Sequence, residues 1–226
     1  MTASPWAEDP ACLRAALALY LVADPEQSVS GDLVADVAAA LAGGVTCVQL
    51  RAKRLTDLDA YRLAIELAGL CRQYRVPLLV NDRLDVALAV GADGIHAGVT
   101  DLPIEVIQRL GNGRLLIGWS PESDGQISAA AADGAHYLGL GPIFGTATKV
   151  DAGEAIGLDG FADRVCHTTL PTVGIGGITS RTAASVVAAG ADGVAVVGAI
   201  LRSSDPRQAA WDLRAVVDAA RGVRAG

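Results

Sequence analysis

The amino-acid sequence predicts the α/β fold class, with a single (β/α)8 TIM barrel. Three observations support this prediction. The chain has 226 residues, which is about the usual length of such a barrel. Alanine-rich helical stretches repeatedly end in glycine and are followed by short apolar runs. These runs are nearly continuous rather than alternating, which is typical of parallel strands that are buried on both faces.

Four of the predicted strands follow one pattern, in which alanine and then Gly or Asp-Gly precede the strand. These segments are AGGVTCVQLR from Ala42, VGADGIHAG from Val90, AADGAHYLGL from Ala131 and AAGADGVAVVGA from Ala188. Four further strands lie between them: LALYLVAD from Leu17, VPLLVND from Val76, RLLIGWS from Arg114 and LPTVGIGG from Leu170. Glycine after a helix supplies the left-handed cap that turns the chain back. The similar segments are therefore expected to be the even-numbered strands of the barrel.

The domain organisation is expected to be simple. Residues 1–13 are interpreted as a loose N-terminal extension, and residues 14–226 as a single barrel domain. An open, doubly wound sheet is the alternative architecture. The sequence disfavours it because no GxGxxG motif follows the first strand.

The composition excludes several classes of protein. Hydrophobic residues make up 51% of the chain and charged residues 19%, which argues against disorder. The net charge of -7 argues against a nucleic-acid partner. No apolar run reaches the ~18 residues of a membrane span, and the N-terminus lacks the pattern of a secretory signal. We therefore expect no membrane partner and a cytoplasmic location; whether the chain forms a homo-oligomer stays open.

The cysteines suggest no metal site. Cys12, Cys47, Cys71 and Cys166 are widely spaced and form no CxxC pair. We expect them to be small buried hydrophobic residues in a reducing compartment.

Polar residues and glycines gather where the predicted strands end. In a (β/α)8 barrel the loops after the strands surround one mouth, where the chemistry takes place. The residues concerned are Gln49, Arg51, Lys53, Asn81, Asp82, His96, Asp101, Ser120, the loop Gly141 to Lys149, Gly174 to Gly177, Val197 and Gly198. We expect them to converge on one cavity.

Structural roles are the alternatives for several of these residues. Asp82 and Asp101 could each cap the helix that follows, and for Asp101 alone this is the favoured interpretation. The side chains around Arg51 could form a solvated strand end. For His96, a hydrogen-bonded core histidine is favoured over a residue of the site.

The polar residues of the mouth suit two anionic ligands. Thr146 and Thr148 offer hydroxyl groups, and Lys149 offers a point charge for phosphate. Backbone amides near Gly177 and Gly198 lie where barrels of this kind usually hold a phosphate. On the other side are two carboxylates, Asp82 and Asp101, and two cations, Arg51 and Lys53. Because Mg²⁺ is typically held by one or two carboxylates and phosphate oxygens, a diphosphate bound through Mg²⁺ is expected there.

The chain resembles a known family over nearly its whole length, from about Ala18 to Ala219. The motifs that carry the resemblance are QLRAK, VNDRLDVALAVGADGIHAG with the following DLP, IGWS, GLGPIFGTATK, VGIGGI and GADGVAVVGAI. In this order they resemble thiamine-phosphate synthase, also called thiamine-phosphate pyrophosphorylase. That family joins a pyrimidine methyl diphosphate to a thiazole phosphate, forms thiamine phosphate and releases pyrophosphate.

The resemblance implies a role for each matching residue. The pyrimidine-diphosphate contacts would be Gln49, Arg51, Lys53, Asn81, Ser120 and Lys149. The Mg²⁺ ligands would be Asp82 and Asp101. The thiazole-phosphate site would consist of Thr146, Thr148, Gly177, Val197 and Gly198. Arg51, Ser120 and Lys149 would stabilise the leaving diphosphate as catalytic residues, and no enzyme nucleophile is required.

The sequence departs from the family pattern at a few positions. Pro121 and Glu122 replace the usual Thr-His, Val99 replaces a glutamine, Gly198 a serine and His136 an aspartate. Two rival interpretations follow: a paralogue related to thiazole tautomerase, and a non-catalytic binder of thiamine-related phosphates. The QLRAK motif and the aspartates argue against both.

Overall fold

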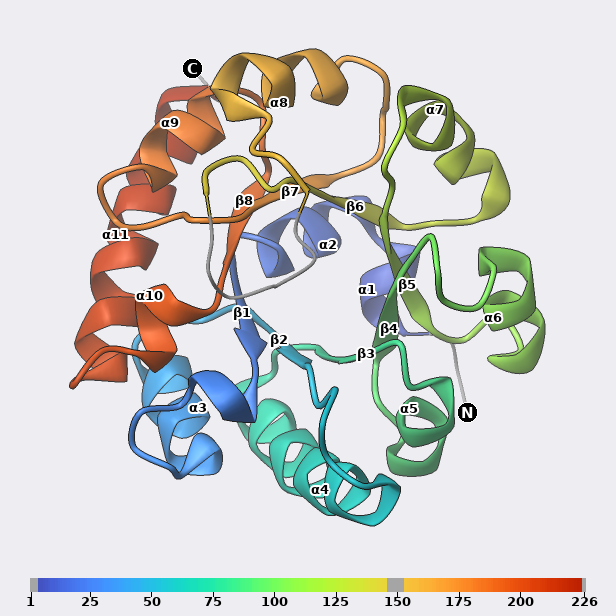
Figure 1. Ribbon diagram of the computed structural model, residues 1–226, viewed down its shortest axis with the longest axis vertical. Coiled ribbons are helices and arrows are strands. Elements are labelled where there is room, and N and C mark those ends of the chain that lie inside the picture. The colour runs from blue at the N-terminus through green and yellow to red at the C-terminus, as the bar shows by residue number, and fades with distance from the viewer. Residues whose placement is uncertain (1–3, 146–152, 225–226) are drawn as a thin grey trace.

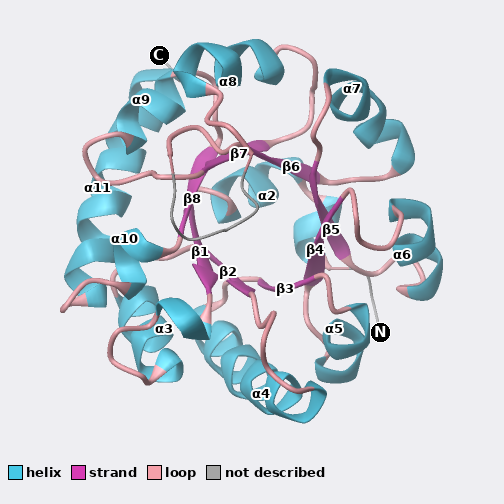
Figure 2. Cartoon of the chain, viewed as in Figure 1, coloured by secondary structure: helices cyan, strands magenta, loops and turns pink. Residues whose placement is uncertain are grey.

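The computed structural model describes residues 4–145 and 153–224. Eight parallel strands close into a barrel in chain order, and helices surround it (Figure 1, Figure 2). The strands are β1 Leu19–Ala23, β2 Cys47–Leu50, β3 Leu78–Asn81, β4 Gly94–Gly98, β5 Leu116–Ser120, β6 Tyr137–Leu140, β7 Thr172–Ile175 and β8 Gly193–Val196. The predicted (β/α)8 barrel is confirmed, and the four similar segments form its even-numbered strands.

Helices of different length follow the strands. They are η1 Pro25–Gln27 (a 3-10 turn), α3 Leu33–Ala42, α4 Asp57–Tyr74, α5 Leu84–Val90, α6 Ile104–Leu110, α7 Asp124–Asp133, α8 Gly157–Val165, α9 Ala183–Ala188, α10 Gly198–Leu201 and α11 Pro206–Arg224. Gly91 and Gly134 end α5 and α7 in the left-handed conformation, with φ of 63° and 98°. Their amides donate to carbonyls of the last helical turn, so these glycines turn the chain back as predicted.

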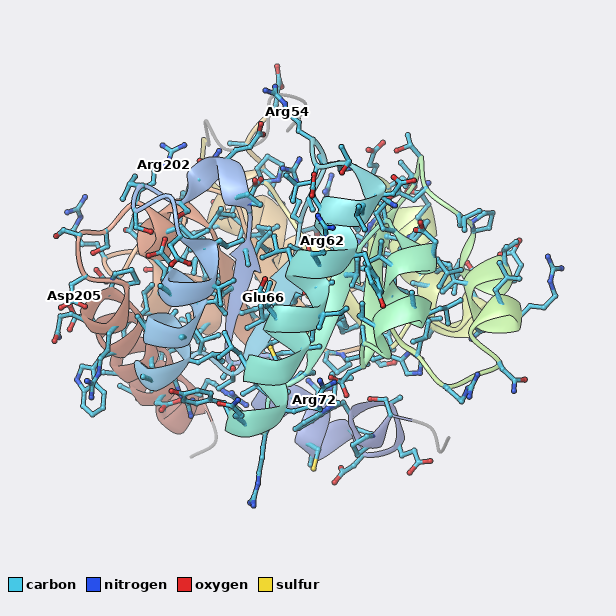
Figure 3. The ribbon with its side chains drawn as sticks, turned by 90° about the horizontal axis from the view of Figure 1, so that it is seen from below. Arg54, Arg62, Glu66, Arg72, Arg202 and Asp205 are labelled. Atoms are coloured by element: carbon cyan, nitrogen blue, oxygen red, sulfur yellow. The ribbon has the colours of Figure 1, made fainter. Side chains whose placement is uncertain are left out.

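Residues 4–16 of the N-terminal segment are largely helical, in contrast to the loose extension expected from the sequence. They form α1 Pro5–Glu8 and α2 Pro10–Ala16, and the Asp9 side chain caps α2 by accepting from the Ala11 amide. Leu13 is buried, and Trp6 packs against the apolar interior of the barrel. Figure 3 shows these helices at one end of the barrel, with Arg54 and Arg202 at the opposite end. The segment therefore closes the floor of the barrel and leaves the other end open.

The apolar residues form two layers. One cluster fills the barrel interior; its members include Leu79 of β3, Leu116 of β5 and Val173 of β7. A larger cluster lies between the outside of the strands and the helices. Since the strands contribute to both clusters, their nearly continuous apolar sequence is explained by burial on both faces.

A repeated hydrogen bond ties each even-numbered strand to the strand before it. The residue immediately before each even-numbered strand accepts from the backbone amide at the start of its neighbour. The four bonds are Leu19 to Thr46 (2.8 Å), Leu78 to Asp93 (2.9 Å), Ile117 to His136 (3.0 Å) and Thr172 to Asp192 (2.9 Å), with the amide donor named first. The Asp-Gly pairs before β4 and β8 therefore supply acceptors through Asp93 and Asp192. Thr46 Oγ1 and His136 Nδ1 accept at the matching places before β2 and β6.

This role of His136 predicts a pH dependence of stability. Burial lowers the pKa of His136, because loss of solvent disfavours the charged ring. The neutral ring accepts from the Ile117 amide through Nδ1. A depressed folded pKa gives stability that is present above the unfolded value of about 6.5 and is lost as the pH falls through the folded pKa. As the pH is lowered below ~6.5, we expect the urea concentration at half-unfolding to decrease in the wild-type protein. The decrease should be smaller in His136→Asp, which retains an acceptor for the Ile117 amide. An identical pH profile in the two proteins would contradict this role, and His167→Gln, at an exposed histidine, is the control.

The cysteines divide into two pairs. Cys47 and Cys71 are buried, as expected, and burial raises the pKa of the Cys71 thiol to about 12. The expectation is wrong for Cys12 and Cys166, which are exposed. All four are free thiols. Among the residues that the structure describes, no helix has both the length and the apolar character that are needed to cross a bilayer.

Candidate active site

The upper ends of the strands open into a cavity of about 860 Å³. Every predicted site residue in the described part of the chain lines it: Gln49, Arg51, Lys53, Asn81, Asp82, Asp101, Ser120, Gly177, Val197 and Gly198. Thr146, Thr148 and Lys149 lie outside the described residues. The convergence expected from the strand ends is therefore found at the mouth opposite the N-terminal helices.

A cluster of opposite charges lies where β2, β3 and β4 end. The Asp82 carboxylate contacts the Lys53 ammonium group and accepts a hydrogen bond from the Asn81 side-chain amide. Burial raises the pKa of Asp82; Lys53 opposes this shift, and the neighbouring Asp101 adds to it. Asp101 lies in turn close to the barrel, since its Oδ2 accepts from the Gly98 amide at 2.8 Å. The two carboxylates are therefore neighbours that repel each other in a partly desolvated place.

Neither aspartate caps a helix. The N-cap of α5 is Arg83 and that of α6 is Pro103, and neither helix has a side-chain capping bond. Asp82 itself has a φ of 59°, which is uncommon outside glycine and best tolerated by Asp and Asn. The N-cap alternative is thus wrong for both residues, and the unusual backbone of Asp82 directs its carboxylate to Lys53.

The aspartate pair is suited to a divalent cation that is shared with a ligand. Within residues 4–145 and 153–224 no group of three or more His, Cys, Asp or Glu side chains could hold a metal ion. Mg²⁺, however, is commonly bound through one or two carboxylates, with substrate phosphates and waters completing its ligands. The Asp101 carboxylate disfavours the ionised form of Asp82, and a cation between the two carboxylates would remove this repulsion.

Arg51 is held by a residue that the sequence analysis missed. Its Nη1 donates to Oδ2 of Asp24 at 2.6 Å, and Asp24 is almost fully buried. The other oxygen of Asp24 accepts from the Glu26 amide at 3.0 Å. Asp24 follows β1 directly, so the rule that polar residues at strand ends belong to the site could have found it. Asp24 also precedes Pro25, a position typical of a helix cap, and it does cap η1 in the structure.

We expect Asp24→Asn to raise the Michaelis constant for a diphosphate ligand about tenfold, because Arg51 loses a charge-assisted bond that fixes its direction. Asparagine keeps the shape and the acceptor for Glu26. Glu26→Gln is the matched control: its ion pair with Arg54 is exposed, with side-chain exposures of 77% for Arg54 and 41% for Glu26. Initial-rate measurements on both variants decide the point. Equal constants in Asp24→Asn and wild type would remove Asp24 from the site.

A glycine-lined wall forms the side of the cavity at β7 and β8. Gly176 and Gly177 follow β7 with φ of 101° and 63°. The loop after β6 packs against them, since the Phe144 amide donates to the Gly176 carbonyl at 3.1 Å. A Cβ on Gly177 would come within 2.6 Å of the Gly145 carbonyl oxygen. This wall, together with Val197 and Gly198, offers backbone rather than side chains to a ligand.

Apart from His136 at the lower end of the barrel, the positions that depart from the family pattern lie at the mouth. Val99, Pro121 and Glu122 all line the cavity, and Glu122 is exposed. The Glu122 amide donates to Oε1 of Gln126, which belongs to the capping box of α7. Glu122 is therefore fixed through its backbone, while its carboxylate stays at the solvent-exposed rim.

A line of hydrogen bonds crosses the floor of the cavity. Gln49 Nε2 donates to the Tyr20 hydroxyl at 2.6 Å, and the hydroxyls of Tyr20 and Tyr137 are 2.8 Å apart. His96 Nδ1 lies 2.8 Å from the Tyr137 hydroxyl, and its Nε2 lies 2.8 Å from Ser120 Oγ. His96 is thus both a hydrogen-bonded histidine, as favoured from the sequence, and a residue of the cavity.

Fold and site together define a class: a (β/α)8 barrel enzyme with an acid-and-cation cluster and a glycine-lined wall at one mouth. Comparison with known proteins identifies the family. The family model for thiamine monophosphate synthase matches residues 19–200. The chain belongs to the thiamine-phosphate synthase family, the transferases of thiamine biosynthesis, as the sequence motifs predicted.

Individual relatives agree with this assignment. A thiamine-phosphate synthase from Chloroflexus aurantiacus is 47% identical, covering 88% of this chain and 92% of the relative. One from Laribacter hongkongensis is 48% identical, covering 88% and 94%. The solved structure of thiamine phosphate pyrophosphorylase from Pyrococcus furiosus matches with a TM-score of 0.85 and 38% identity, covering 92% of this chain and 98% of the other. A 3-hexulose-6-phosphate synthase, at 17% identity and a TM-score of 0.64, shares the fold.

Proposed function

We propose that the chain couples 4-amino-2-methyl-5-(diphosphomethyl)pyrimidine to 4-methyl-5-(2-phosphoethyl)thiazole. The bond between the pyrimidine methylene carbon and the diphosphate oxygen breaks, and a bond from the thiazole nitrogen to that carbon forms. The products are thiamine phosphate and pyrophosphate. The observation that carries the proposal is the pairing of Asp82 with Asp101 beside Lys53, in one cavity with the glycine-lined wall.

The proposed reaction requires departure of the diphosphate, whose charge must be stabilised as it leaves. We assign this task to Arg51, Lys53 and Lys149, with a hydrogen bond from Ser120. Mg²⁺ held by Asp82 and Asp101 would neutralise further negative charge on the diphosphate when bound. Positive charge that develops on the pyrimidine methylene is spread over the aminopyrimidine ring of the substrate itself.

The second substrate is placed by its own phosphate. We assign the thiazole phosphate to the backbone amides near Gly177, Val197 and Gly198, with the hydroxyls of Thr146 and Thr148. Gln49 and Asn81 would contact the pyrimidine substrate. Since no enzyme nucleophile takes part, the contribution of the protein is alignment and charge stabilisation; alignment alone reaches ~7–11 kcal/mol in favourable systems.

The test is to incubate the purified protein with both substrates and Mg²⁺ and to quantify thiamine phosphate and pyrophosphate. Equal amounts of the two products, with none when Mg²⁺ or either substrate is omitted, are expected. A change in the thiazole without pyrimidine or metal would identify a tautomerase instead, and affinity without product would identify a binder. A cytoplasmic location stays a prediction, and whether the chain forms a homo-oligomer stays open.

A further inference from the structure

The hydrogen-bonded line across the cavity floor joins side chains from five different strands. Gln49 is on β2, Tyr20 on β1, Tyr137 on β6, His96 on β4 and Ser120 on β5. Gln49 and both tyrosines are buried, with exposed fractions of 5%, 2% and 0%. Buried hydroxyl and amide groups are costly unless they are paired, so each bond of the line has to be made for the barrel to be stable.

Two glycines leave the space that this line occupies. A Cβ on Gly118 would lie 2.3 Å from the Tyr137 hydroxyl and 2.4 Å from His96 Nδ1. A Cβ on Gly139 would lie 3.1 Å from His96 Cε1 and 3.3 Å from Ser120 Oγ. The barrel therefore has no side chain at the two positions where one would break the contacts of His96.

The line has a direction because it begins with the side-chain nitrogen of Gln49, which is a donor. The Gln49 side-chain nitrogen gives its proton to the Tyr20 oxygen, so the Tyr20 hydroxyl turns its own hydrogen to Tyr137. Tyr137 then directs its hydrogen to His96 Nδ1, which must be unprotonated to accept it. The proton of the neutral imidazole is left on Nε2, facing Ser120 Oγ. Having accepted this bond, Ser120 keeps its hydroxyl hydrogen for another acceptor.

We propose that Tyr20 and Tyr137 are positioning residues that hold His96 in the Nε2-protonated form, so that Ser120 donates its hydroxyl hydrogen to a ligand oxygen in the cavity. The ligand part of this proposal rests on the proposed function, in which the acceptor is an oxygen of the leaving diphosphate. The tautomer part concerns the protein without ligand. The tyrosines act through His96 and contact no reacting atom.

Burial of the two phenols supports this arrangement. It raises the pKa of Tyr20 and of Tyr137 well above the usual value of 10, so both hydroxyls keep their hydrogens at neutral pH. A serine without such a line could turn its hydroxyl hydrogen toward the histidine instead. In that case the bond to the ligand would be lost.

The first test is the ¹⁵N spectrum of the histidine rings in the ligand-free protein. The chain has 3 histidines, and His136 is an internal reference because its Nδ1 accepts from the Ile117 amide. We expect His96 to show a protonated Nε2 and an unprotonated Nδ1. A protonated Nδ1 at neutral pH would overturn the proposal. This measurement uses no substrate, so it stands even if the protein were to make no thiamine phosphate.

The second test compares Tyr137→Phe with Tyr61→Phe, which removes a hydroxyl from the outer helix α4. In Tyr137→Phe we expect both His96 tautomers to be populated and kcat to fall roughly 3- to 10-fold, with the Michaelis constant for the thiazole phosphate unchanged. Tyr61→Phe should match wild type in both readouts. A fall in kcat with the tautomer unchanged would show a merely structural role and overturn the proposal. In Tyr20→Phe, Tyr137 loses the donor that directs its hydroxyl, so both His96 tautomers should be populated there as well. A wild-type tautomer in Tyr20→Phe would contradict the role given to Tyr20.

Discussion

Asp82→Asn is expected to lower turnover roughly 100-fold or more, because loss of a metal ligand removes several kcal/mol of charge stabilisation from the leaving diphosphate. Asparagine is the appropriate replacement. It tolerates the φ of 59° at this position nearly as well as aspartate does. Alanine would add backbone strain to the chemical effect and obscure the result.

The fold of this variant should survive. Burial raises the pKa of Asp82, and Asp101 adds to the shift. The folded pKa of Asp82 therefore lies above the unfolded value of about 3.9. The contribution of Asp82 to the stability of the folded protein is fully present below pH ~3.9 and is lost as the pH rises through the folded pKa. At neutral pH the ionised Asp82 therefore costs stability, so Asp82→Asn should unfold at a temperature no lower than wild type.

Steady-state assays at saturating Mg²⁺, with a thermal melt of each protein, measure both effects. Asp85→Asn is the matched control. It lies three residues further on, its side chain is 65% exposed, and it pairs with Arg83 outside the cavity cluster. Asp85→Asn should retain wild-type turnover. Wild-type rates in Asp82→Asn would remove this residue from the site.

Gly177→Ala is expected to raise the Michaelis constant for the thiazole phosphate roughly 10- to 100-fold. The new Cβ would approach the Gly145 carbonyl oxygen to 2.6 Å and the Phe144 Cβ to 2.8 Å, and the φ of 63° disfavours alanine. Either the loop after β6 or the amide of residue 177 has to move. Both changes disturb the wall that we assign to the phosphate.

Gly198→Ala on the same wall is the control for this variant. The atoms nearest to its Cβ would belong to the side chain of Arg202, the first at 3.2 Å, and a long side chain can give way. We expect a small change there and a large one in Gly177→Ala, with the Michaelis constant for the pyrimidine substrate close to wild type in both. A Michaelis constant for the thiazole phosphate close to wild type in Gly177→Ala would contradict the role given to the wall.

The sequence predicts the barrel well because its pattern is repeated. Each Asp-Gly or Gly before an even-numbered strand marks a helix end and a strand start, and apolar runs give the burial on both faces. The polar strand ends likewise place Lys53, Asp82 and Asp101 at one mouth. Asp24 was missed although it satisfies the same rule, because a single aspartate before proline is also a common cap.

Other features could not be predicted, because they depend on the register of the closed barrel. Whether Tyr20 and Tyr137 point into the barrel or toward the helices is decided by strand tilt and stagger, which the sequence does not display. Their meeting with His96 joins positions far apart in the chain. The docking of α1 and α2 under the barrel is also a tertiary effect, since these short helices are held by burial of Leu13 and Trp6.

The most direct measurement is calorimetric titration of two ligands, pyrophosphate with Mg²⁺ and the thiazole phosphate alone, into three proteins: wild type, Gly177→Ala, and a variant carrying both Asp82→Asn and Asp101→Asn. If the mouth holds two separate anion sites, the double variant loses pyrophosphate binding and keeps the thiazole phosphate, while Gly177→Ala does the reverse. Loss of the same ligand in both variants, or Mg²⁺-independent binding of pyrophosphate to wild type, would contradict the division of the cavity.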